Sequence, residues 1–125
     1  MLYLCLSLFI YIFKIYNLKL KDDDNLQKLD FSYKGFGNKG IENLYNFNIP
    51  YLKELYLSKN QISDIKVLEK VKFDNLKKLD LITNQISDIK VLEKVKFENL
   101  EELDLYSNQI DKNEYPVLIQ NLNKK

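Results

Sequence analysis

The sequence of 125 residues contains no histidine, tryptophan, alanine or arginine, and its only cysteine is Cys5. Without histidine, neither a Ser-His-Asp triad nor a Cys-His dyad can form. A lone cysteine excludes a disulfide framework, and the lack of histidine also excludes a zinc site built from Cys and His. The composition therefore predicts a protein that is not an enzyme, with no catalytic residue, small-molecule substrate, cofactor or metal site.

An excess of charge of one sign is also lacking. The chain has 19 basic and 18 acidic residues, which gives a formal net charge of +1. Nucleic-acid binding depends on a strongly basic surface, so we expect no nucleic-acid partner. Apolar residues make up 46% of the chain, which is enough to fill a core and excludes general disorder. A chain of this length forms one domain rather than two with separate cores.

A repeat of 24 residues organises most of the sequence. The tripeptide Asn-Gln-Ile begins at Asn60, Asn84 and Asn108, and residues 60–76 and 84–100 differ at one position only. Within each unit, Leu-x-Leu predicts a short strand with both leucines inward, and later apolar residues at threefold spacing predict a helical turn against the same core. No unit can bury its apolar side alone, so stacked neighbours must form the fold.

The unit reads L-x-x-L-x-L-x-x-N-x-I-x-x-I-x-x-L-x-x-V-x-F-x-x and resembles the leucine-rich repeat family, in particular the short repeats of internalins and of a protein-phosphatase regulator. The resemblance covers residues 26–122 with about four repeats, and it implies an α/β solenoid. A short parallel sheet would form the concave face, with helical turns or short helices on the convex face. In this family the asparagine hydrogen-bonds backbone groups of adjacent turns. Residues 1–25 are interpreted as a hydrophobic N-terminal segment and cap, and residues 123–125 as a C-terminal tail.

Both end units are predicted to carry a longer return segment than the middle units. In the first unit, which begins at Leu26, Phe36 occupies the position that the isoleucine of Asn-Gln-Ile holds in the other units. The next apolar residues follow five and eight positions later, as they do after Ile110 in the last unit. These residues are Ile41 and Leu44 in the first unit and Tyr115 and Leu118 in the last. We expect a short amphipathic helix over residues 116–122 that closes the stack, since terminal repeats are atypical.

Two short motifs could suggest ligand sites. Residues 35–40 match G-x-G-x-x-G, but Pro50 limits the following helix to about two turns, which is short for pyrophosphate binding. No acidic residue stands about 20 positions further on at the end of a second strand, so we predict a turn rather than a nucleotide site. The acidic run at residues 22–24 lacks further ligands at loop spacing and is interpreted as a solvated charge run rather than a metal site.

Residues 1–13 form an almost wholly apolar run, which Lys14 ends. Three interpretations are open: a signal peptide, an uncleaved membrane anchor, and a hydrophobic cap of the stack or gene-model artefact. The run lacks a basic start and a small-residue cleavage site, and it is shorter than the roughly 20 residues of a spanning helix. Lys14, Lys19 and Lys21 favour a cytoplasmic position for the flank that follows. We expect a cytoplasmic protein. Residues 1–17 would tether it to a membrane if they are an uncleaved anchor, and the protein would be secreted if they act as a signal peptide.

The two middle units differ mainly where side chains are expected to face outward from the concave sheet. Residues 52–75 and 76–99 differ at five of 24 positions, and four of these lie on or just after the predicted strand. One interpretation is a diversified binding surface. The other is recent gene conversion of the return segments, with older and neutral differences in the strands. The candidate partner-binding residues are Tyr56, Lys78, Asp80, Ile82, Asp104 and Tyr106.

The outward residues are expected to form columns across the strands. An exposed Ile82 between Tyr56 and Tyr106 would form an apolar-aromatic cluster, which is a typical interface anchor. Asp80 and Asp104 would lie side by side, which is unfavourable unless solvent or a basic group of a partner compensates them. Another column is expected to alternate in sign, and its members are Lys28, Glu54, Lys78 and Glu102.

These patterns predict a non-catalytic module that binds a partner protein through its concave sheet. Two alternatives remain open. The chain could be a regulatory or targeting subunit of an enzyme such as a phosphatase, as the resemblance suggests, and would then co-purify with an enzyme whose activity it changes. It could also be a fragment of a larger receptor-like repeat protein, because the array is short.

Overall fold

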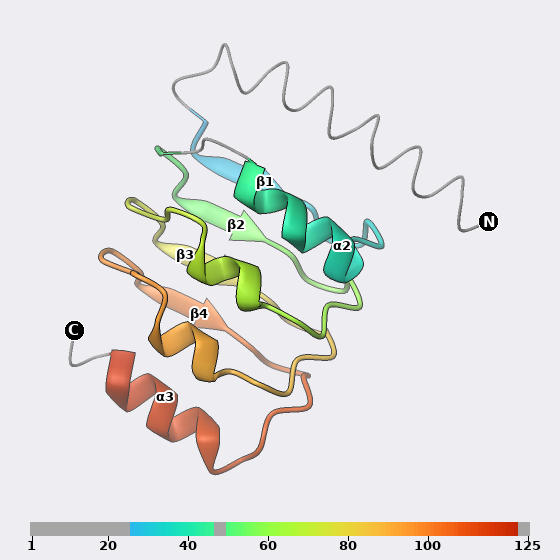
Figure 1. The fold of residues 1–125 in the computed structure, drawn as a ribbon, viewed down its shortest axis with the longest axis vertical. Helices are drawn as coiled ribbons and strands as arrows, with labels where there is room; N and C mark the ends of the chain where they lie inside the picture. Colours follow the sequence, from blue (N-terminus) through green and yellow to red (C-terminus); the bar gives the residue numbers. More distant parts are fainter. Residues whose placement is uncertain (1–25, 47–49, 123–125) are drawn as a thin grey trace.

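The structure is a computed structural model that describes residues 26–46 and 50–122. The N-terminal segment, with its apolar run and residues 22–24, and the tail at residues 123–125 lie outside the described residues. Short strands alternate with helical segments along the chain (Figure 1). In order they are β1 (Lys28–Asp30), α2 (Gly37–Glu42), η1 (Asn43–Asn46), β2 (Glu54–Tyr56), η2 (Lys66–Glu69), β3 (Lys78–Asp80), η3 (Lys90–Glu93), β4 (Glu102–Asp104) and α3 (Glu114–Leu122), where η marks a 3₁₀ helix.

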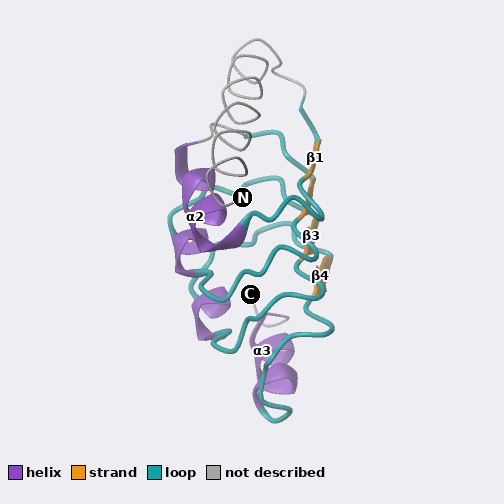
Figure 2. Cartoon of the chain, turned by 90° about the vertical axis from the view of Figure 1, so that its right-hand side faces the viewer, coloured by secondary structure: helices purple, strands orange, loops and turns teal. Residues whose placement is uncertain are grey.

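The strands form one parallel sheet in the order β1-β2-β3-β4. Leu29, Leu55, Leu79 and Leu103 lie opposite one another in successive strands, so each unit stacks on the next in the phase of the repeat. Figure 2 shows the sheet on one side of the molecule and the helical segments on the other. Each strand is joined to the next by a helical crossover segment, which neighbouring parallel strands require. The arrangement is the expected α/β leucine-rich repeat solenoid.

The core lies between these two layers and is filled by the same repeat positions in each unit. In the unit that contains β3 the inward residues are all buried, and they are Leu79, Leu81, Ile86, Ile89, Leu92, Val95 and Phe97. Burial of each such side chain contributes about 1.5–3 kcal/mol. Phe73 and Phe97, one repeat apart, stack with ring centroids 6.0 Å apart. The stacking of units therefore supplies the stability that no single unit could provide.

The two end units carry longer helical segments than the middle units, as predicted. The first unit has α2 followed by η1 and the last has α3, whereas each middle unit has only a 3₁₀ turn. The last helix begins at Glu114, two residues earlier than expected, and Pro116 lies in its first turn, where the missing N–H removes no helical hydrogen bond. Figure 2 shows α3 across the end of the stack, between the two layers.

Tyr115 departs from the expected pattern. It has the same spacing from Ile110 as the buried Ile41 has from Phe36, but Tyr115 is 38% exposed, whereas Leu118 is buried. Ile41 is covered by the unit that follows it, while the last described unit has no further unit stacked on it. The burial of a repeat position therefore depends on its neighbour as well as on its own unit.

The glycine motif at residues 35–40 lies where the chain turns into α2: Gly35 and Phe36 precede the helix, and residues 37–40 are its first four residues. Gly35 and Gly37 have φ angles of +63° and +56°, which residues with a Cβ rarely adopt. Gly40 packs so closely on Phe36 that a Cβ there would lie 2.6 Å from the ring. These glycines are explained by backbone conformation and packing. In the part of the chain that the structure describes, no helix is both long and apolar enough to cross a membrane.

Asn60, Asn84 and Asn108 form a ladder inside the stack. The Asn84 Oδ1 accepts the backbone N–H groups of Asn60 and Ile62 at 3.0 and 3.1 Å. Its Nδ2 donates to the carbonyl groups of Leu57, Leu81 and Ile82, at 3.1, 3.0 and 3.3 Å. Each asparagine thus joins its own turn to the preceding one, as the family resemblance implied.

Candidate functional site

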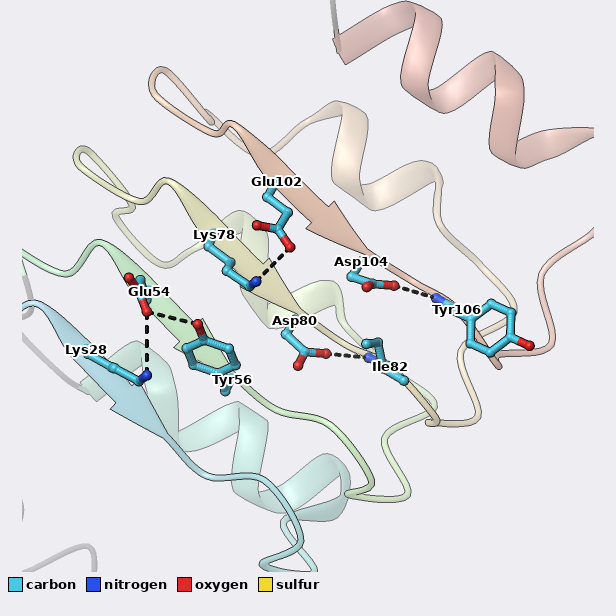
Figure 3. Close-up of polar contacts among 9 residues, drawn as sticks. All are labelled: Lys28, Glu54, Tyr56, Lys78, Asp80, Ile82, Glu102, Asp104 and Tyr106. Carbon is cyan, nitrogen blue, oxygen red and sulfur yellow. Dashed lines mark hydrogen bonds and ion pairs between the residues drawn. The ribbon is translucent and has the colours of Figure 1, made fainter.

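The outward side chains of β1–β4 and the residues directly after each strand form one surface, here called the sheet face. Its first column is the charged row, which consists of Lys28, Glu54, Lys78 and Glu102. The Lys28 Nζ lies 3.7 Å from Glu54, and the Lys78 Nζ lies 2.6 Å from Glu102 (Figure 3). The hydrogen bond to Glu102 raises the pKa of the Lys78 ammonium group. The predicted alternation in sign is confirmed, and such exposed pairs each contribute about 0–1 kcal/mol.

Tyr56 is held within the charged row rather than left free. Its hydroxyl donates to Glu54 Oε2 at 2.9 Å, and this hydrogen bond raises the pKa of the phenol. The Lys28 and Lys78 ammonium groups lie 4.7 and 5.5 Å from the centre of its ring. Cations at such distances are attracted to the face of an aromatic ring. Tyr56 is therefore half-buried and fixed between two lysines, as Figure 3 shows.

The second column contains three aspartates that end their strands in the same way. In each case the carboxylate Oδ1 accepts the backbone N–H two residues later, which is an Asx turn. The pairs are Asp30 with Ser32 at 2.9 Å, Asp80 with Ile82 at 2.9 Å and Asp104 with Tyr106 at 3.1 Å. These carboxylates therefore have a local structural role in addition to any role in binding.

Asp80 was expected to be exposed, and this expectation is wrong, because the residue is only 9% exposed. Tyr56 lies opposite it on one side and Asp104 on the other. Its carboxylate also turns toward the Ile82 N–H, which draws it down onto the backbone. The predicted adjacency of two like charges is confirmed by the register, and the Asx turns explain how the sheet tolerates it.

Asp30 offers a test of these turns by pH. The Ser32 backbone N–H and then the Ser32 hydroxyl stabilise the carboxylate, and they lower the pKa of Asp30 below its ordinary value of 3.8. A lowered folded pKa adds stability that is present above that ordinary value and is lost as the pH falls through the folded pKa. We expect Asp30→Asn to be less stable than the wild type at pH 6, by less than about 1 kcal/mol since the group is exposed.

Urea unfolding of both proteins between pH 6 and pH 2 measures this effect. The difference in the free energy of unfolding should shrink as the pH falls below 3.8. A difference that stayed constant down to pH 2 would show that the charge on Asp30 does not strengthen the turn.

Ile82 and Tyr106 lie next to each other on the third column of the sheet face. The Thr83 N–H donates to the Tyr106 carbonyl at 2.9 Å, which fixes the two strand ends side by side. Tyr106 is 79% exposed, and Ile82 is half-buried rather than exposed as expected. Tyr56 belongs to the column of Asp80, so it does not flank Ile82 as predicted (Figure 3). The apolar part of the sheet face therefore centres on Ile82 and Tyr106.

The structure adds one aromatic contact at the other end of the sheet face. The Lys59 Nζ lies 4.6 Å from the centre of the Tyr33 ring, and Tyr33 is 67% exposed. Both residues occupy the same repeat position, directly after their strands, and both have a positive φ. The repeat alignment contained this signal, because it places the two residues in one column.

Among residues 26–46 and 50–122, no group of three or more acidic, cysteine or histidine side chains could hold a metal ion. One open groove of about 380 Å³ lies beyond Tyr106, at the end of β4, and Ile110 and Tyr115 contribute to its lining. The sheet face therefore offers aromatic rings, one aliphatic side chain and paired charges, which suit contact with another protein.

Family models for leucine-rich repeats match two parts of the chain. A model described as "Leucine Rich repeats (2 copies)" matches residues 50–94, and one described as "Leucine Rich Repeat" matches residues 99–122. Together they cover more than half of the chain. A search of curated proteins found no match. The first unit lies outside these matches, but β1 pairs with β2, and Asn60 accepts the N–H groups of Lys34 and Phe36.

Proposed function

The chain belongs to the leucine-rich repeat family, and on that premise we propose that it is a protein-binding module whose sheet face contacts a partner protein. Leucine-rich repeats generally mediate protein–protein interactions, and the family is typically non-catalytic. The residues proposed to carry the contact are Ile82 and Tyr106 at the centre, with Tyr56, Lys78 and the free carboxylate oxygens of Asp80 and Asp104 around them.

One observation supports this proposal above the others. Four of the five differences between the two middle units lie on the sheet face or directly after the strand, at positions 54/78, 56/80, 58/82 and 59/83. The return segments of the same units are almost identical. Packing limits substitution of the inward residues, but it does not limit substitution of the outward residues on the helical side. Only Asp74/Glu98 differs elsewhere, and divergence concentrated on the sheet face favours a surface that contacts a specific partner.

The chemistry of this face indicates the kind of partner. Tyrosine and isoleucine supply apolar contact area at the centre, where hot spots of protein interfaces occur. The charged row already pairs its own charges, so a partner need not carry a strong net charge. A protein surface with an apolar patch beside mixed polar groups fits this arrangement best.

A capture experiment with three forms of the chain tests the proposal. The wild type, the sheet-face variant Ile82→Ser/Tyr106→Ala and the control Tyr45→Ala would be immobilised, and bound proteins identified by mass spectrometry. Tyr45 is 59% exposed and lies in η1, on the helical side. We expect the wild type and the control to capture the same partner, and the sheet-face variant to bind it at least about 30-fold more weakly, since two hot-spot side chains are lost.

Circular dichroism of all three forms would show that each is folded. Equal capture by the sheet-face variant and the wild type would place the binding surface elsewhere. If the captured partner is an enzyme whose rate changes on binding, the chain would be its regulatory subunit, which is the alternative that the sequence leaves open.

A further inference from the structure

The last described unit is more open than the units before it. Leu55 and Leu79 are fully buried in β2 and β3, but Leu103, at the same repeat position in β4, is half-buried. Ile86 and Ile110 show the same contrast one turn later. The helix α3 packs against η3 and leaves β4 as the edge strand of the sheet. An edge strand presents backbone groups that another strand can pair with.

Two backbone donors at this edge lack the acceptors that their equivalents have. The Leu57 and Leu81 N–H groups each donate to a carbonyl of the next unit at 2.9 Å, and the Lys59 and Thr83 N–H groups do the same at 3.0 and 2.9 Å. The equivalent donors of the last unit are the N–H groups of Leu105 and Ser107. Neither has an acceptor within residues 26–46 and 50–122.

One backbone acceptor at the same edge is also open. The Lys53 carbonyl accepts the N–H groups of Lys77 and Lys78, at 2.8 and 3.0 Å. One repeat later, the Lys77 carbonyl accepts those of Glu101 and Glu102 at 2.8 and 2.9 Å. The Glu101 carbonyl, at the next equivalent position, receives no such pair from the described residues. Together with the two donors it defines the register of an added parallel strand.

The charges at this edge define the side chains that such a strand would carry. Glu101 and Glu102 pair inward with Lys77 and Lys78, and each Nζ–Oε1 distance is 2.6 Å. Inside the sheet, Glu54 lies opposite Lys28 of β1 and Lys78 of β3, so a carboxylate between two lysines already occurs in this fold. A lysine on the outer side of Glu102 would continue this alternation. The column of Glu101 runs Gln27, Lys53, Lys77 and Glu101 and does not alternate, so the lysine beside Glu101 is inferred only from its opposite charge. An acidic strand would instead place like charges opposite each other, which is unfavourable.

The groove beyond β4 would receive the strand's apolar side chains. It has a volume of about 380 Å³, and Leu105, Ile110 and Tyr115 contribute to its lining. Leu105 itself is buried, whereas Ile110 is half-buried and Tyr115 is 38% exposed, so the open apolar surface of the groove comes from the last two. The exposed surface of Tyr115 is therefore available to a side chain that enters the groove.

We propose that the edge of β4 binds an extended basic strand of a partner protein, in parallel, with two consecutive lysines beside Glu101 and Glu102 and a Leu-x-Leu segment over the groove. This binding mode is β-strand addition. It uses the edge of the sheet and shares Asp104 and Tyr106 with the sheet face, because both residues line the groove. The peptide test below reads the Leu105 and Ser107 amides, so its failure would leave the function proposed above untouched. A second copy of the chain fits less well, because its β1 has Gln27 where the first lysine is required.

The chain itself supplies two matched probe peptides. Residues 77–84 read KKLDLITN and residues 101–108 read EELDLYSN, so both share the strand pattern and differ in the charge of the first two residues. They also differ at Ile82/Tyr106 and Thr83/Ser107, so KKLDLITN with its two lysines replaced by glutamate serves as a third peptide that isolates the effect of charge. Each peptide would be titrated to millimolar concentration into the ¹⁵N-labelled full-length chain at low salt. We expect KKLDLITN to slow hydrogen exchange at the Leu105 and Ser107 amides, and EELDLYSN to bind at least about tenfold more weakly.

The variant Glu101→Lys/Glu102→Lys should reverse this preference, and its thermal unfolding would show that it is folded. Equal binding of both peptides, or exchange at the two amides that neither peptide changes, would overturn the proposal. Sedimentation of the labelled chain alone tests whether a second copy of the chain occupies the edge of β4 instead. If self-association already protects these amides without any peptide, the edge binds a second copy and the proposed basic strand is wrong.

Discussion

Replacement of Leu79 by alanine should lower the free energy of unfolding by about 2–5 kcal/mol. Leu79 is fully buried at the centre of β3, and its partners Leu55 and Leu103 lie opposite it in the two neighbouring strands. The units on both sides hold these neighbours in place, so they cannot move far into the space that the substitution creates. The loss should therefore include the cost of a cavity as well as the lost burial. Urea unfolding followed by circular dichroism measures it.

Leu103→Ala is the matched control for this prediction. It occupies the same repeat position in β4, but it is half-buried because no further unit covers it. We expect it to lose less than about half of what Leu79→Ala loses, since less apolar area leaves water at that site. Equal losses at the two positions would contradict the view that stacking between units, rather than packing within one unit, supplies most of the stability.

Asn84→Ala should have the second largest effect, a loss of about 3 kcal/mol. Asn84 is only 8% exposed, and its side-chain amide satisfies two backbone donors and three backbone acceptors. Each buried backbone group that is left without a partner costs about 1–3 kcal/mol, and alanine can replace none of these hydrogen bonds. The free energy of unfolding in urea gives the total effect.

Hydrogen exchange separates this prediction from a general loss of stability. The Asn60 and Ile62 amides should exchange faster in the variant than amides elsewhere in the core, because Asn84 Oδ1 is their acceptor. Asn108→Ala is the control: Asn108 is half-buried, and its side chain accepts one such N–H, that of Ile86. We expect it to lose about 1 kcal/mol. A neutral Asn84→Ala would show that the asparagine ladder is not needed.

The register of the sheet could be predicted from the sequence because the middle units are nearly identical and the first unit keeps the same strand pattern. Glu54, Lys78 and Glu102 are 24 residues apart, and Lys28 precedes Glu54 by 26 because the first return segment is longer, so their alignment is also their order across the sheet. The inward leucines and the asparagine ladder followed from the same argument. Longer helical segments at the two ends were also foreseen, because their apolar spacing differs from that of the middle units.

Side-chain placement on the sheet face could not be predicted in the same way. Asp80 was expected to be exposed, but Tyr56 and Asp104 lie directly beside it and the Ile82 N–H draws its carboxylate inward. Tyr56 turns toward Lys28, Lys78 and Glu54 rather than toward Ile82. These outcomes depend on rotamers that several neighbours select together, and a repeat pattern contains no information about that choice.

The repeat pattern was enough to predict the period, the inward residues, the parallel order of the strands and the two charge columns, because burial and stacking act on every unit alike. The exposure of individual side chains beside β4 became visible only in the folded stack. Leu103, Ile110 and Tyr115 obey the same pattern as buried residues of earlier units, yet they are partly exposed. The reason is physical: a repeat specifies one unit and its fit to a neighbour, and whether that neighbour is present is a property of the assembled stack.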